Sequence, residues 1–228
     1  MGFWCRARES ARPETRLTAT NLKIWSDRLL SAAARTLPAG FAGGGDTALR
    51  EFSDEQGDRR ASDEPLLAWV LGVPPRLAVA PESAEVRIWR SLAAKTPWDD
   101  ALLAPNPAMP LLSLPPQTTI EVWTEAELSA LHALWHVARR EGRADLERRC
   151  MAAAGAYMEQ IQPDNATNHP WAIHVFLMHA QYTGAPDGRM YAETMLHNCQ
   201  VGRGKPDRLS AVILLDAGRS LATASGEA

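Results

Sequence analysis

The sequence predicts an all-α fold made of antiparallel helical hairpins. Two observations support this prediction. Apolar residues recur at spacings of three and four through nearly all of the second half, which is typical of amphipathic helices. Turns of only a few residues, rich in glycine and proline, separate these periodic segments. Because short turns join consecutive helices, neighbouring helices should run antiparallel.

The predicted domain organisation has two parts and a short tail. Residues 1–119 form an irregular arm with about three short helices, residues 120–223 form a five-helix domain, and residues 224–228 form a disordered tail. Within the arm, residues 53–64 are almost all charged or small and polar. Such a segment buries too little apolar surface to offset the entropy of ordering it, so we expect a mobile acidic loop.

The arm contains three helical segments. A first helix is predicted from Thr20 to Thr36, because one face gathers Leu22, Trp25, Leu29 and Ala32. Residues 66–73 form a short apolar helix or strand, and residues 82–95 form an amphipathic helix. Six prolines between residues 96 and 117 break any regular element, and the leucines among them favour an extended segment laid across the core.

Five helices follow in the second half. The first starts at Thr124, because Thr124 and Glu127 have the spacing of a capping box, and it ends at Gly142. The segment from Trp171 to Tyr182 is apolar nearly all round, so we expect this helix in the middle of the domain. The remaining helices are predicted to end near Ile161, to run from Asp187 to Val201, and to start near Asp207.

The starts of these hairpins repeat with a loose period of about 36 to 47 residues, the range of helical repeat arrays. The arrangement also resembles part of an α/α toroid, a ring of helical hairpins. The chain is too short for a full ring. The fold class is therefore a helical-repeat array or a partial toroid-like array.

Composition excludes several classes of partner. A formal charge of -3 and a pI near 6.1 give no long-range attraction to phosphate backbones or anionic membranes, so we expect neither nucleic acid nor a membrane as partner. Cys5, Cys150 and Cys199 lack the spacing of a disulfide framework or a thiolate zinc site, which fits a reducing compartment. No apolar run is long enough for a signal peptide or a membrane span. We expect a cytoplasmic protein.

A group of polar residues stands out against the apolar periodicity. Asp216 shares a helix face with Leu209 and Ile213, so it should be buried with a partner, which we expect to be a histidine of the central helix or the loop from Gln162 to Pro170. Two alternatives stay open, a ligand pocket and a closed network of satisfied hydrogen bonds. The candidate polar cluster consists of Asp164, Asn165, Asn168, His169, His174 and Asp216.

Two pairs of residues have the i, i+4 spacing that can place two side chains on one metal ion. His132 and His136 are the first pair, and a helical projection puts them on one face with Glu125, Arg139 and Arg140. We interpret this face as solvated, and its guanidinium groups would repel a cation. Glu193 and His197, the second pair, are interpreted as surface partners. The sequence therefore predicts no metal and no cofactor.

No catalytic signature is present, so the leading functional hypothesis is a helical scaffold or protein-interaction module. It would bind another protein or a second copy of itself, with the eight tryptophans as contact residues. One alternative is an enzyme with a polar pocket in a toroid-like helical fold. A second alternative is a helical bundle that binds metal through histidine and glutamate.

Overall fold

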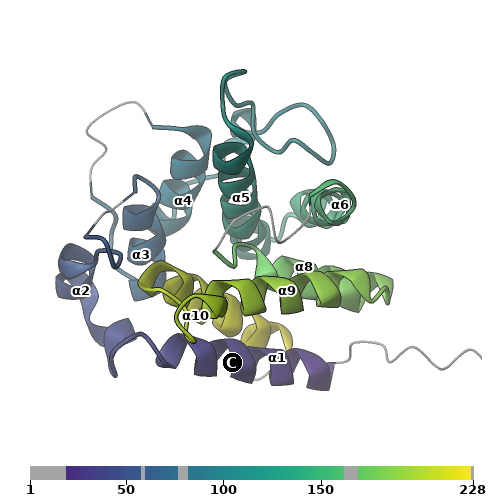
Figure 1. Ribbon diagram of the computed structural model, residues 1–228. Helices are drawn as coiled ribbons and strands as arrows, with labels where there is room; N and C mark the ends of the chain where they lie inside the picture. Colours follow the sequence, from purple (N-terminus) through teal and green to yellow (C-terminus); the bar gives the residue numbers. More distant parts are fainter. Residues whose placement is uncertain (1–18, 58–59, 77–81, 162–168, 227–228) are drawn as a thin grey trace, which may run out of the picture.

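The computed structural model of the chain describes residues 19–57, 60–76, 82–161 and 169–226, and within these residues it is all-helical (Figure 1). The helices are α1 (Ala19–Ala34), α2 (Gly45–Glu51), α3 (Asp63–Leu71), α4 (Ala84–Ala94), α5 (Ile120–Glu141), α6 (Ala144–Gln160), α8 (Ile173–Thr183), α9 (Asp187–Val201) and α10 (Arg208–Ala224). Two 3-10 helices, η1 (Phe41–Gly43) and η2 (Asp100–Leu102), lie between them.

The predicted hairpins are present. α5 and α6 pack against each other, as do α8 and α9. Gly142 with φ 63° and Gly184 with φ 72° end α5 and α8 in the left-handed conformation, which a residue without Cβ adopts at little cost. The predicted bounds of α9 match the structure, and Asp207 caps α10 by accepting the backbone N–H of Ser210 at 2.7 Å.

One hydrophobic core extends through both halves of the chain. α1 lies along α10, where Trp25 and Leu29 are buried and Ser26 Oγ donates to the carbonyl oxygen of Gly218 at 2.8 Å (Figure 1). α3 packs on α4, and α4 packs on α5. The described part of the predicted arm therefore contributes four α-helices, and it covers α5 and α10 instead of standing apart from them.

The predicted start of α5 is wrong. The helix begins one turn earlier, at Ile120, with Thr119 as its N-cap. Thr124 and Glu127 are buried inside the helix. The Glu127 carboxylate accepts the backbone N–H groups of Leu111 and Leu112 at 2.6 and 2.7 Å. It thus ties the proline-rich segment to α5, a task that the local pattern could not reveal.

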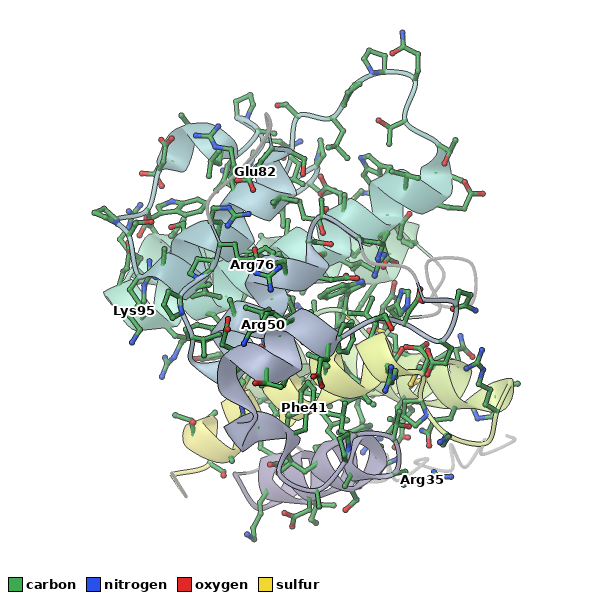
Figure 2. The ribbon with its side chains drawn as sticks, turned by 90° about the vertical axis from the view of Figure 1, so that its left-hand side faces the viewer. Arg35, Phe41, Arg50, Arg76, Glu82 and Lys95 are labelled. Atoms are coloured by element: carbon green, nitrogen blue, oxygen red, sulfur yellow. The ribbon has the colours of Figure 1, made fainter. Side chains whose placement is uncertain are left out.

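The end of the predicted acidic loop is also more ordered than expected. Ser62 and Asp63 are buried, and Asp63 opens α3 after accepting the backbone N–H of Arg60 at 2.9 Å. Arg90 of α4 donates to Glu82 at 2.8 Å and pairs with Glu64 at 3.3 Å. Figure 2 labels Glu82 on the face that these helices form. Charged contacts of Asp63 and Glu64 therefore help to order the end of the predicted loop.

No described helix is both long enough and apolar enough to cross a membrane.

The close contact between α8 and α9 gives a stability prediction. A Cβ on Gly188 would lie 2.3 Å from the carbonyl oxygen of Phe176, a backbone atom that cannot move aside. Gly188→Ala should therefore lower the free energy of unfolding by about 1 to 3 kcal/mol. Gly155→Ala is the matched control, because its new Cβ meets only the end of the His179 side chain, at 3.4 Å, and gains up to about 1 kcal/mol of helix propensity. Urea titrations of both variants measure the free energies of unfolding. Equal stability of Gly188→Ala and Gly155→Ala would contradict the close contact between α8 and α9.

Candidate active site

A polar stripe runs along the inward face of α5. It consists of Glu125, Ser129, His132 and His136, at helical spacings of three and four. The sequence-based prediction that this face is solvated is wrong, because His132 is fully buried and the His136 side chain is only 11% exposed. The projection correctly put Glu125, His132 and His136 on one face, but α3, α4, α8 and α10 cover that face.

Asp216 of α10 lies against this stripe and is buried, as predicted. Its Oδ1 accepts the indole N–H of Trp69 at 3.0 Å, and its Oδ2 lies 3.1 Å from Nε2 of His132. Nε2 of His136 is also close, at 2.8 Å from Oδ2, but lacks hydrogen-bond alignment. The predicted histidine of the central helix is therefore not the hydrogen-bond partner, and most of the predicted loop lies outside the described residues. Among the described residues the partners come from α3 and α5, elements distant in sequence.

These contacts keep the Asp216 carboxylate ionised. Burial by itself would raise the pKa of this carboxyl group. The close contact with His136 and the hydrogen bond from His132 outweigh burial and hold the pKa well below its usual range. The site therefore contains a desolvated negative charge that positive or hydrogen-bonding neighbours stabilise.

A backbone contact fixes the tautomer of His132. Nδ1 of His132 accepts the backbone N–H of Ala172 at 3.1 Å, so Nδ1 carries no proton and Nε2 is the donor to Asp216. Ala172 has φ 55°, a left-handed conformation that costs free energy for a residue with a side chain. Burial lowers the pKa of His132, although Asp216 opposes that effect, and the ring is neutral.

His174 of α8 completes the group. Its ring lies 4.2 Å from the His132 ring and 5.1 Å from the His136 ring, measured between centroids, and it stacks on His136. It is fully buried, and neither ring nitrogen has a hydrogen-bond partner among the described residues. Burial, reinforced by the two neighbouring histidines, puts its pKa well below the usual value. Such a buried polar group requires an explanation beyond packing.

A cleft of about 390 Å³ opens onto this cluster, with His136 and Asp216 in its lining. Trp69 and Met178 line it as well, and Arg139 and Arg219 lie at its edge. The remaining lining residues come from the last two turns of α3, α8 and α10 and from the buried face of α5. They are Val70, Trp135, Tyr182, Ser220, Thr223 and Ala224.

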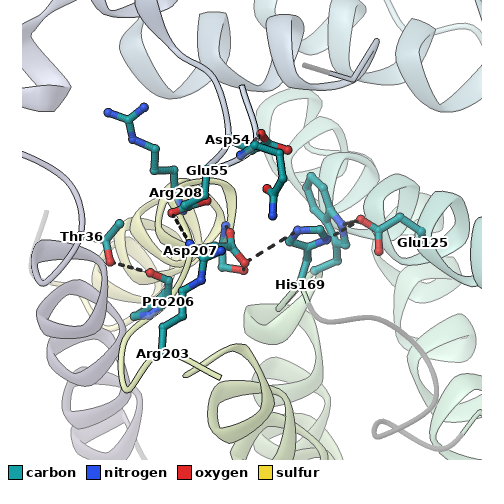
Figure 3. A network of polar contacts seen from close by, with 12 residues as sticks. Thr36, Asp54, Glu55, Glu125, His169, Arg203, Pro206, Asp207 and Arg208 are labelled. Carbon is teal, nitrogen blue, oxygen red and sulfur yellow. Dashed lines mark hydrogen bonds and ion pairs between the residues drawn. The ribbon is translucent and has the colours of Figure 1, made fainter. Parts of the chain in front are cut away.

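The structure brings together only two of the residues predicted for the cluster, His174 and Asp216. Asp164, Asn165 and Asn168 lie outside the described residues. His169 lies elsewhere, where its Nδ1 is 2.9 Å from Glu125 and its Nε2 is 4.0 Å from Asp207 (Figure 3). It connects α5 to the start of α10 and does not line the cleft.

One further sequence interpretation changes. Glu193 does not pair along its own helix, because both its carboxylate oxygens accept from Arg28 of α1 at 2.7 Å. Cys150 and Cys199 are buried thiols, as their helical positions indicated, and burial raises the pKa of Cys199 to about 12. Sequence reasoning missed the roles of Trp69, His132 and His136. The spacing of the α5 stripe was the available signal, but it does not say whether a polar face points inward.

No family model matches this chain, and comparisons with the curated proteins and with the solved structures find no significant match.

A second group of charges lies at the other end of the stripe, around Glu85 of α4. Burial raises the pKa of Glu85 to about 7. A hydrogen bond from Ser129 and the charge of Arg60 oppose this shift, whereas Glu125 and Asp63 add to it. Below this pKa the folded protein holds a proton on Glu85.

This shift predicts a pH dependence of stability. A carboxyl group whose pKa is higher in the folded state than in the unfolded state contributes less stability as pH rises between the two values. Relative to Glu85→Gln, the parent should lose about 2 kcal/mol of unfolding free energy between about pH 5 and about pH 7. Urea titrations at both pH values measure this, with Glu159→Gln on the exposed face of α6 as control. Parallel curves for the parent and Glu85→Gln would show that Glu85 is not desolvated.

Proposed function

We propose that this protein is an enzyme whose active site is the cleft above His136 and Asp216. The observation that supports this is the position of the buried cluster at the floor of an open cleft. Functional sites are where burial and charge neighbours shift pKa values most strongly. A structural network would instead satisfy each buried polar atom, and His174 is not satisfied by any described residue.

The cleft suits a small molecule with a polar reacting group and an apolar part. Its volume is at the lower end of the range for small-molecule sites. Trp69, Trp135 and Met178 supply apolar surface, whereas Asp216 and His136 supply the groups for chemistry. Arg139 and Arg219 at the edge give donors that can orient an oxygen-rich substrate.

Occupation of the cleft can be tested without knowing the substrate. Thermal-shift screening of a library of small metabolites should find a compound that raises the melting temperature of the parent. Thr223→Trp places a large side chain in the cleft and should abolish that increase. Thr194→Trp is the matched control, because both threonine hydroxyls donate to a carbonyl one turn earlier at 3.1 Å, but Thr194 lies on α9 away from the cleft. A compound that stabilises the parent and Thr223→Trp equally would contradict this location.

A second candidate function is a protein-interaction module in the cytoplasm, built on repeat-like helical hairpins. The exposed residues Ile120 and Val122, at 65% and 60%, favour it, because they place two apolar side chains in solvent in the first turn of α5. The tryptophans that were expected as contact residues offer little exposed surface within the described part of the chain. All seven within the described residues are buried or partly buried.

If the first turn of α5 binds a second copy of the chain, the double variant Ile120→Ser, Val122→Ser should weaken self-association. Sedimentation velocity at increasing protein concentration measures this. Ile24→Ser, which removes an exposed apolar residue on α1, serves as control. A parent that stays monomeric at all concentrations would remove self-association from consideration.

A further inference from the structure

The donor atoms at the floor of the cleft converge as metal ligands do. His132, His136 and His174 each offer one ring nitrogen within 4.8 Å of the others. Oδ2 of Asp216 lies 2.8 Å from Nε2 of His136. Two ligands of a tetrahedral zinc ion lie roughly 3.3 Å apart, given metal–ligand distances near 2.0 to 2.1 Å. The distance from Oδ2 to Nε2 is close to that spacing and the histidine nitrogens lie within 4.8 Å, so side-chain rotations would be needed to bring these atoms onto one cation.

His174 gives independent evidence of a ligand. A buried polar atom without a partner costs about 1 to 3 kcal/mol, and both ring nitrogens of His174 are in this position among the described residues. An apolar side chain would fill the same space without that cost. A metal ion would use one of these nitrogens directly.

The three histidines are not equivalent as ligands. His132 receives a backbone N–H at Nδ1, so its only proton is on Nε2. Binding a metal through Nε2 would remove that proton and leave an anionic ring, which is unfavourable in a buried site. His132 and Trp69 instead donate to the two oxygens of Asp216, and each oxygen keeps a second lone pair. Groups that orient a ligating carboxylate in this way surround most metal sites.

Arg139 and Arg140, which were expected from the sequence to repel a cation, have partners of their own. Arg140 points away and donates to the carbonyl oxygens of Ser91 and Leu92 at 3.1 and 3.2 Å. Arg139 pairs with Glu147 at 3.2 Å. The last turns of α3, α5, α8 and α10 all line the cleft, and the partial negative charge of helix C-termini favours a cation there.

We propose that His136, His174 and Asp216 form a two-histidine, one-carboxylate site for a divalent transition-metal ion, with His132 and Trp69 as positioning residues. Nitrogen and carboxylate ligands of this kind suit zinc or iron(II). Three protein ligands leave positions open to water or substrate, and a bound ion activates water and polarises substrate oxygens. The inference rests on the proposed function for its catalytic purpose, because the ion would lie where the cleft ends.

The test starts with protein purified without a metal-affinity tag. Elemental analysis should find about one zinc or iron per chain, and chelator-treated protein should bind zinc again in calorimetric titration. His174→Phe should weaken zinc binding by more than about 100-fold. His132→Gln and Trp69→Phe should weaken it by about 10- to 100-fold, the effect of removing a group that orients a ligand. His179→Phe, on the next turn of α8, should bind zinc as the parent does.

Stability of the metal-free proteins separates loss of a ligand from loss of folding. His174→Phe removes a desolvated imidazole, so its metal-free melting temperature should equal or exceed that of the parent. The metal site is overturned if the parent holds no ion and binds no zinc, or if folded His174→Phe binds zinc as the parent does. If His132→Gln loses zinc as completely as His174→Phe, the assignment of His132 as a positioning residue is wrong. If the parent as purified holds no ion and binds no zinc, yet its cleft binds a compound that Thr223→Trp blocks, this inference is refuted and the proposed function stands.

Discussion

The polar stripe on the inward face of α5 is the constraint on which the rest of the structure depends. A helix that buries a glutamate, a serine and two histidines needs a partner for each, because an unpaired polar group loses its hydration without compensation. Two indole N–H groups donate to the stripe itself, and a third donates to Asp216, which is the acceptor for His132. Trp171 donates to Glu125 at 2.7 Å, Trp89 donates to Ser129 at 2.9 Å, and Trp69 donates to Asp216 at 3.0 Å.

These donors explain the arrangement of the other helices around α5. The tryptophans come from α3, α4 and the residue pair before α8, so each of these elements must approach the stripe closely. α10 must also approach, because Asp216 is the acceptor for the histidine end of the stripe. The large indole rings fill the space between the helices while their single donors satisfy the polar atoms. Packing and hydrogen bonding thus require the same positions.

The two ends of the stripe differ in chemistry. At the Glu125 end, Arg60, His169 and Trp171 all contact the carboxylate, and this part of the stripe holds segments together. At the His136 end, the carboxylate of Asp216 has oriented donors, but His174 has no partner among the described residues, and a cleft reaches the cluster. The first arrangement is typical of a structural network. The second concentrates unsatisfied groups where a ligand can enter, which is typical of a site for chemistry.

The sequence by itself determined the all-helical class, the five helices of the second half and most of their ends. Apolar spacing, Gly142, Gly184 and the cap at Asp207 act within a few residues, so local patterns report them. The burial of Asp216 also followed from its helix face. Only the tertiary structure decided which way the α5 stripe points, that Thr119 and not Thr124 caps α5, and that Trp69 and His132 meet Asp216. Helical periodicity groups residues on one face, but when that face is polar it does not tell whether the face is buried or exposed. The direction is set by segments forty or more residues away in the chain, whose donors make burial of the stripe favourable.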